Sequence, residues 1–166
     1  AEAHAALRNF SEAEKYYDKA INFNRNLFGN KSYQALERYV GLGLFYAKFQ
    51  KYNKAITLLS DAEILSSGLT ANHREVRANI LNTLGMVHNI LGNYDRAESY
   101  YVDSISIKES LSGSAQADLG SSYMSLGLLY VMINSKDKAE DYFRKNLTFS
   151  KIKYGDFSLQ YADALL

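Results

Sequence analysis

The residues of this chain best suited to specific chemistry are three asparagines and a methionine, Asn79, Asn82, Met86 and Asn89. Their separations of i, i+3, i+7 and i+10 place all four on one stripe of an α-helix. A carboxamide side chain both donates and accepts hydrogen bonds, so it can pair with a peptide backbone in either direction. The stripe could therefore pair with a peptide backbone, and the alternative is an ordinary solvated stripe.

Catalytic and metal-binding patterns are poorly represented. The chain has no cysteine and no His-x-x-x-His pair, so we expect neither a thiolate nucleophile nor a zinc site. The glycines of segment 41–43 lie in a helical pattern, whereas a phosphate-binding loop needs a strand, a turn and a helix. His4 and His88 share a repeat position with tyrosines and are expected to pack rather than to ligate. We therefore expect no enzymatic activity, no cofactor and no metal.

Composition narrows the class of protein further. The 166 residues carry a net charge of +1 and no basic stripe of the kind that binds nucleic acid. No run of about 18 apolar residues predicts a membrane span, and the first ten residues lack the pattern of a secretion signal. We expect a cytoplasmic protein without a nucleic-acid partner. Helical periodicity along nearly the whole chain, with no proline, predicts an all-α fold.

A 42-residue repeat organises this helical pattern. Glycines recur at that interval, as do a small residue and a bulky residue that follow each glycine. The three sets are Gly43, Gly85 and Gly127, then Ala13, Ala55, Ala97 and Ala139, then Tyr17, Leu59, Tyr101 and Phe143. Glycine inside a helix costs about 1 kcal/mol relative to alanine. We expect closer packing of two helices at the glycine to offset that cost, with the bulky residue filling the space beside it.

Residues typical of helix boundaries recur in the same register and predict helical hairpins. The predicted N-caps of the second helix, helix B, are Ser11, Asn53, Asp95 and Asp137. Three of them have a glutamate at the capping-box spacing, namely Glu14, Glu98 and Glu140. Left-handed ends of helix B are predicted at Gly29, Gly113 and Gly155, with Ala71 as the exception. The N-caps predicted for the following helix A are Asn30, Asn72, Ser114 and Asp156.

These boundaries define the expected helices and repeat units. Helix A is expected at 31–49, 73–91 and 115–133, and helix B at 11–28, 53–69, 95–111 and 137–153. Residues 1–8 are expected to be the end of an earlier helix A. The corresponding units are a partial unit at 1–29, full units at 30–71, 72–113 and 114–155, and the start of a further unit at 156–166. We interpret the chain as a fragment of a longer array.

The repeated features resemble the tetratricopeptide repeat: Leu-Gly-x-x-Tyr, an alanine twelve residues after the glycine, and a bulky residue four further on. The 42-residue length is similar to the kinesin-light-chain type of this family, most clearly at 76–101 and 154–165. The resemblance implies a right-handed α–α superhelix, or solenoid, of antiparallel helical hairpins. It also implies that A helices line the concave face and that an asparagine at the position of Asn82 holds a peptide backbone.

We therefore predict a non-enzymatic scaffold that binds a peptide or a partner helix in its concave groove. Apolar residues that replace asparagine in the neighbouring repeats, such as Val40 and Met124, favour a more apolar groove. The predicted peptide-binding residues are Asn79, Asn82, Met86, Asn89, Val40, Leu44, Met124, Leu128 and Arg77. Two alternatives remain open: a structural segment that self-associates through uncapped ends, and a peptide-sensing regulatory domain of a larger protein.

Overall fold

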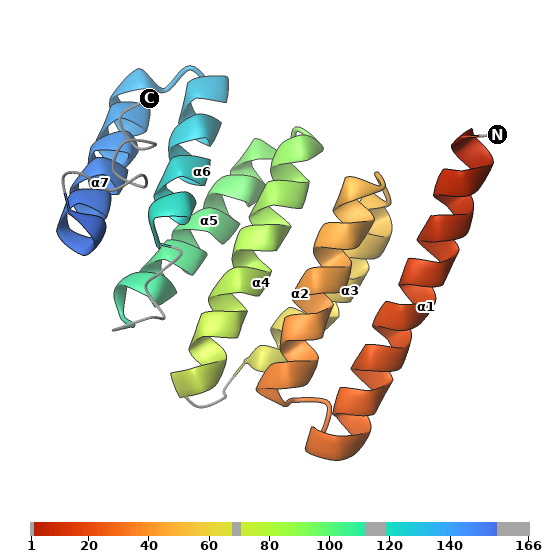
Figure 1. Ribbon diagram of the computed structural model, residues 1–166. Coiled ribbons are helices and arrows are strands. Elements are labelled where there is room, and N and C mark those ends of the chain that lie inside the picture. The colour runs from red at the N-terminus through yellow and green to blue at the C-terminus, as the bar shows by residue number, and fades with distance from the viewer. Residues whose placement is uncertain (1, 68–70, 112–118, 156–166) are drawn as a thin grey trace. The chain divides into compact units, whose positions relative to one another are not determined.

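The computed structural model describes residues 2–67, 71–111 and 119–155, and within them every regular element is a helix. The helices are α1 (Glu2–Phe28), α2 (Tyr33–Lys48), α3 (Tyr52–Ser66), α4 (Ala71–Ile90), α5 (Tyr94–Glu109), α6 (Leu119–Met132) and α7 (Lys136–Tyr154) (Figure 1). The all-α prediction is confirmed. The chain divides into two compact units, residues 1–87 and 88–166, which are described separately below.

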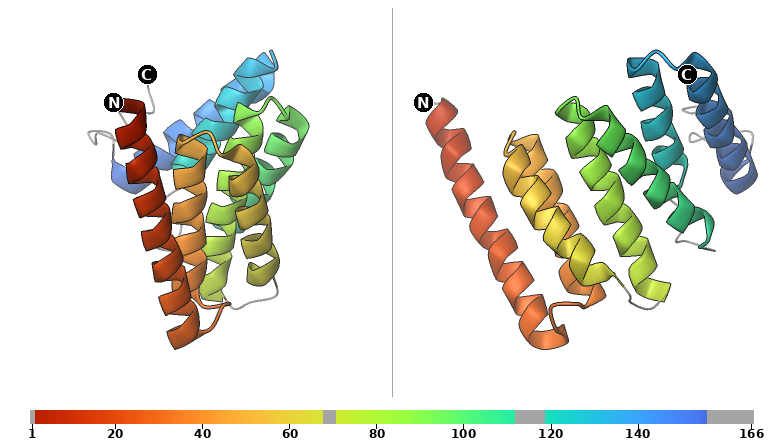
Figure 2. Two further views of the ribbon diagram at one scale, coloured as in Figure 1. Left: turned by 90° about the vertical axis from the view of Figure 1, so that its right-hand side faces the viewer. Right: turned by 180° about the vertical axis from the view of Figure 1, so that it is seen from behind.

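Each unit contains an antiparallel hairpin of the predicted kind. In the first unit α2 packs on α3, and in the second α6 packs on α7, as the views from the side and from behind also show (Figure 2). The hairpin turns pass through a left-handed residue, Gln50 (φ 57°) or Asn134 (φ 58°). The amides of Lys51 and Ser135 then donate to the carbonyls five residues earlier, at 2.8 Å in both turns. This bond satisfies a carbonyl that the end of helix A would otherwise leave free.

The predicted close approach at the repeat glycine is confirmed in both hairpins. A Cβ added to Gly43 would lie 2.7 Å from Leu59 Cδ2, and one added to Gly127 would overlap the ring of Phe143. Leu59 is fully buried, so it has no open space into which to move. The bulky residue of helix B therefore lies directly over the glycine of helix A, in van der Waals contact with its backbone.

The predicted break before Ser11 is wrong, because α1 runs without interruption from Glu2 to Phe28 (Figure 1). In the other repeats the chain turns at one repeat position. The residues there are Gln50, Gly92 and Asn134, and all three have positive φ. Its counterpart in α1 is Arg8, a strong helix former that stays helical. Phe10 holds α1 against α2, with its ring centroid 5.0 Å from that of Phe45 and 5.2 Å from that of Phe49.

The predicted N-caps of the other B helices are also wrong, by two residues. The cap positions are Lys51, Asn93 and Ser135, and none of these three side chains caps its helix. The chain re-enters the helix directly after the left-handed turn, so Asn53, Asp95 and Asp137 already lie in the first helical turn. There the carboxylates of Asp95 and Asp137 still interact favourably with the helix dipole.

Junctions between hairpins agree with prediction at their glycines and differ at the caps. Gly29 (φ 86°) and Gly155 (φ 84°) are left-handed, as expected for ends of helix B. Helix α2 is capped by Ser32, whose Oγ accepts from the Ala35 amide at 3.2 Å, rather than by Asn30. Ala71 and Asn72 both lie inside α4. Gly113, Ser114 and Asp156 lie outside the described residues.

We predict that Gly43→Ala lowers the free energy of unfolding by about 1–3 kcal/mol, because its methyl group would overlap the immobile Leu59 side chain. Gly41→Ala is the matched control in the same helix. Its methyl group would lie 3.3 Å from the Tyr17 ring, which is partly exposed and free to shift. The control should leave stability unchanged or raise it by up to about 1 kcal/mol. Urea unfolding followed by circular dichroism measures both, and equal effects would contradict the close-crossing interpretation.

Candidate binding surface

The first unit holds six of the predicted binding residues, on two A helices. On α2, Val40 and Leu44 are one helical turn apart, Val40 half-buried and Leu44 exposed. On α4, Asn79, Asn82 and Met86 are half-buried and follow the predicted stripe. The stripe stays at the surface because the residues between its members face the core. Ile80, Leu84 and Val87 are fully buried.

The carboxamide of Asn82 has an unusual environment. Its Oδ1 is shielded from solvent and accepts no hydrogen bond from the residues that the structure describes. A buried acceptor without a donor costs about 1–3 kcal/mol, and native proteins leave few such groups. The Asn82 oxygen is thus an acceptor that an incoming N–H donor would satisfy.

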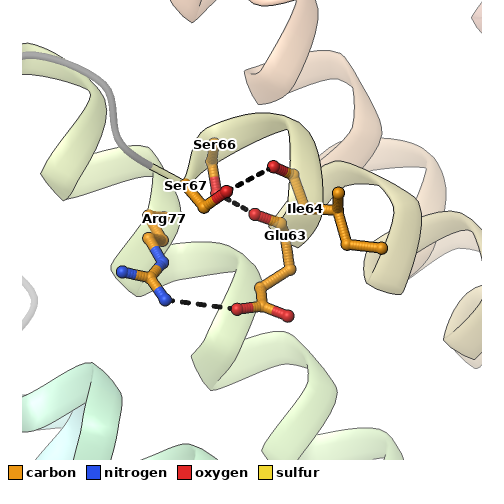
Figure 3. Close-up of polar contacts among 5 residues, drawn as sticks. All are labelled: Glu63, Ile64, Ser66, Ser67 and Arg77. Carbon is orange, nitrogen blue, oxygen red and sulfur yellow. Dashed lines mark hydrogen bonds and ion pairs between the residues drawn. The ribbon is translucent and has the colours of Figure 1, made fainter.

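Arg77, the sixth residue, is engaged with the preceding helix. Its Nη2 donates to Glu63 Oε1 of α3 at 3.2 Å (Figure 3). The hydroxyls of Ser66 and Ser67 donate to the carbonyls of Glu63 and Ile64 where α3 ends. The Nε of Arg77 is shielded and has no acceptor among the described residues. Glu63 therefore neutralises part of the charge of Arg77 and leaves one donor unused.

The second unit holds the other three predicted residues. Asn89, near the end of α4, repeats the feature of Asn82, since its Oδ1 is shielded and lacks a donor in the described part of the chain. On α6, Met124 is half-buried and Leu128 is exposed. Exposed Val131 and Met132 extend the apolar surface of α6 toward its end. This unit therefore presents an unsatisfied amide oxygen on α4 and apolar side chains on α6.

A hollow of about 820 Å³ lies away from these residues. Seven of its eight lining residues belong to α1, including Ala13, Tyr17 and Phe23, and the other is Arg38 of α2. None of the nine predicted binding residues lines it. Within the described ranges no group of three or more His, Asp or Glu side chains is placed to hold a metal ion. No helix of that part is long and apolar enough to cross a membrane.

His88 is a buried packing residue, as its repeat position predicts. Its ring stacks on Tyr100 with centroids 5.5 Å apart, and Asn93 Nδ2 lies 3.5 Å from its Nδ1. Burial lowers the pKa of His88 below its ordinary value of 6.5, and the charge of Arg96 lowers it further. The neutral imidazole is therefore the form that the fold stabilises. The side chain of His4 lies outside what the structure describes.

Sequence reasoning missed a polar contact that occurs in both units. Tyr46 Oη and Lys54 Nζ donate to Glu14 Oε1 at 2.7 and 2.8 Å. The same contact joins Tyr130 and Lys138 to Glu98, at 2.6 and 3.4 Å. We call this arrangement the Glu–Tyr–Lys clamp. Both glutamates were predicted to form capping boxes instead.

The electrostatics of the clamp follow from its geometry. The hydrogen bonds from Lys54 and then Tyr46 lower the pKa of Glu14 below its ordinary value. Burial chiefly raises the pKa of the Tyr46 and Tyr130 hydroxyls, and the bond to glutamate raises it further. Each lysine also lies over the tyrosine ring, at 5.3 Å for Lys54 and 4.9 Å for Lys138. The sequence contains a signal for the clamp. A glutamate is followed by a tyrosine 32 residues later and a lysine 40 residues later, and the same three residue types recur two repeats further along the chain.

The fold and its recurring contacts define a class of protein built from stacked helical hairpins. Residues 76–151 and 1–33 match sequence models of the tetratricopeptide repeat. The chain belongs to the tetratricopeptide repeat family. Proteins of this family generally mediate protein interactions and are typically non-catalytic. The α–α superhelix predicted as the fold class is the fold of this family.

Solved structures share this fold at low sequence identity. The crystal structure of BtubC (BKLC) from P. vanneervenii matches with a TM-score of 0.75 and 18% identity over 95% of this chain. This chain spans 62% of the length of BtubC. A Podosopora anserina putative kinesin light chain with nearly identical TPR-like repeats matches with a TM-score of 0.71 and 12% identity, over 98% of this chain and 77% of that one. No curated protein matches the sequence significantly.

We predict that stability falls as the pH drops below about 6.5, because unfolded His88 takes up a proton before folded His88 does. The contribution of the neutral ring is fully present above the unfolded pKa and is lost as the pH falls through the lower folded pKa. His88→Tyr, the usual residue of this repeat position, should remove that part of the pH dependence. Urea midpoints at pH 7.5, 6.0 and 5.0 test this, and parallel curves for the two proteins would refute it.

Proposed function

We propose that this protein is a non-enzymatic scaffold that binds an extended peptide or partner helix along its A helices, on the concave face expected for the family. The observation that carries the proposal is the pair of shielded amide oxygens of Asn82 and Asn89, which accept no hydrogen bond from the described part of the chain. They are seven residues apart on α4, two helical turns along the same stripe. Backbone N–H groups of an extended ligand are donors of the kind that these oxygens lack.

Apolar side chains on the A helices α2 and α6 support the same proposal. In the first unit exposed Leu44 and half-buried Val40 offer contact area, and in the second exposed Leu128 and half-buried Met124 do so. Methionine adapts its shape to different partners, which suits a surface that holds varied side chains. The unused Nε of Arg77 adds a donor for a ligand carbonyl or carboxylate. A cytoplasmic location, predicted from composition, belongs to this proposal.

We predict that Asn82→Ala combined with Asn89→Ala weakens peptide binding at least tenfold, because each substitution removes an acceptor that only the ligand satisfies. Peptides selected from a random dodecamer display library on the wild-type protein serve as probes, and their affinities are measured by fluorescence anisotropy. The thermal midpoint should stay unchanged or rise, since the unliganded protein loses two unsatisfied oxygens.

The control is Asn22→Ala combined with Asn26→Ala, which removes two exposed amides from α1. This variant should bind the selected peptides as the wild type does. Selected peptides that bind all three proteins with equal affinity would reject the asparagine stripe as the binding surface.

A further inference from the structure

The two Glu–Tyr–Lys clamps join a helix B of this chain to the hairpin that follows it, and both use the same residue types at the same separations. In each, the glutamate belongs to a helix B, on α1 or α5. The tyrosine comes from the following helix A, on α2 or α6, and the lysine from the first turn of the helix B after it. Tyrosine and lysine are eight residues apart on either side of one hairpin turn. The glutamate of each clamp therefore binds a tyrosine hydroxyl and a lysine ammonium that only a folded hairpin brings together.

Helix α7 carries the same acceptor without the two donors. Glu140 is in register with Glu14 and Glu98, and among the described residues it bonds only to Arg144 on its own helix, at 2.7 Å. Its side chain is 65% exposed, against 23% for Glu14 and 31% for Glu98. An exposed ion pair within one helix is weak. The Glu140 carboxylate is thus free to exchange Arg144 for stronger partners.

Glu140, together with Lys136 and Arg144, lines a groove whose other lining residues are apolar. The groove has a volume of about 490 Å³, and its apolar lining includes Val131, Ala139, Phe143 and Leu147. Two of its lining residues are more exposed than their counterparts in the α2–α3 hairpin. Leu59 is fully buried whereas Phe143 is half-buried, and Ala47 is 7% exposed whereas Val131 is 55% exposed. The groove is therefore a hairpin-docking surface that, within the described residues, has no hairpin on it.

We infer that this face of α7 docks a further helical hairpin that places a tyrosine hydroxyl and a lysine ammonium on Glu140. The tyrosine lies on the first helix of that hairpin and the lysine eight residues later, as in both clamps of this chain. A second copy of this chain does not fit, because its own Tyr46–Lys54 and Tyr130–Lys138 pairs already bind their glutamates. The surface shares no residue with the asparagine stripe, so the inference is independent of the proposed function.

The chain supplies a probe and a matched control for this inference. By repeat register Leu166 corresponds to Val40, so residues 41–67 are appended after Leu166 to place a copy of the α2–α3 hairpin. The appended Tyr46 and Lys54 then follow Glu140 by 32 and 40 residues, the separations of both clamps. The control extension is residues 83–109, which have the same length and register but carry His88 and Arg96 in place of tyrosine and lysine.

Hydrogen exchange of the α7 amides is the readout. We expect the 41–67 extension to raise their protection at least tenfold over the unextended chain, and Glu140→Gln to reverse about tenfold of that gain, as for a lost charge-assisted hydrogen bond. Tyr46→Phe in the appended copy should cause a similar loss, and the two changes together little more than either alone. With the 83–109 extension, Glu140→Gln should have no such effect.

Two results would overturn the inference. One is α7 protection that does not change on adding residues 41–67, since docking would then not occur. The other is an equal effect of Glu140→Gln in both extended chains, which would show that Glu140 does not recognise the tyrosine and lysine.

Discussion

The architecture depends on the close approach of two helix backbones at a glycine. Where Gly43 meets Leu59 and Gly127 meets Phe143, a Cβ would overlap the side chain opposite, so a larger residue would force the helices apart. The gain is tight packing of a buried alanine and a bulky residue, such as Ala55 and Leu59, against helix A. Because each hairpin depends on this crossing, the spacing of the glycine sets the length of the repeat and the register of every other contact.

Polar contacts between successive hairpins are superimposed on this apolar framework, and they differ along the chain. The first unit has Glu14 with Tyr46 and, separately, Arg77 with Glu63. The second has Glu98 with Tyr130, and also Glu109 with Tyr123. The repeat position of Glu14 and Glu98 is Ile56 in the repeat between them. Apolar packing alone would accept different hairpins at the same position. A partly buried carboxylate is satisfied only by a hairpin that supplies the correct donors. These polar contacts therefore favour one order of hairpins.

The family fold does not identify a ligand, because one fold supports many interactions. Information about binding comes instead from groups that the fold leaves unsatisfied. The shielded oxygens of Asn82 and Asn89 lack donors within the described residues. Among the residues that the structure describes, Glu140 has only Arg144, an exposed partner on its own helix. The first pair suits an extended backbone, which supplies N–H groups in series, and the carboxylate suits a folded hairpin, which presents a hydroxyl and an ammonium together.

The sequence by itself determined the helical class, the 42-residue unit and the close crossing of two helices at Gly43, because these features follow from local periodicity repeated in phase. It also placed Asn82 and Asn89 on one helical stripe. It did not determine that α1 continues through Ser11, since that depends on whether one residue, Arg8, enters the left-handed conformation. Only the tertiary structure showed that Glu14 and Glu98 bind residues 32 and 40 positions away, and that the two asparagine oxygens lack donors among residues 2–67, 71–111 and 119–155. Contacts over such separations depend on how helices pack, which local pattern does not encode.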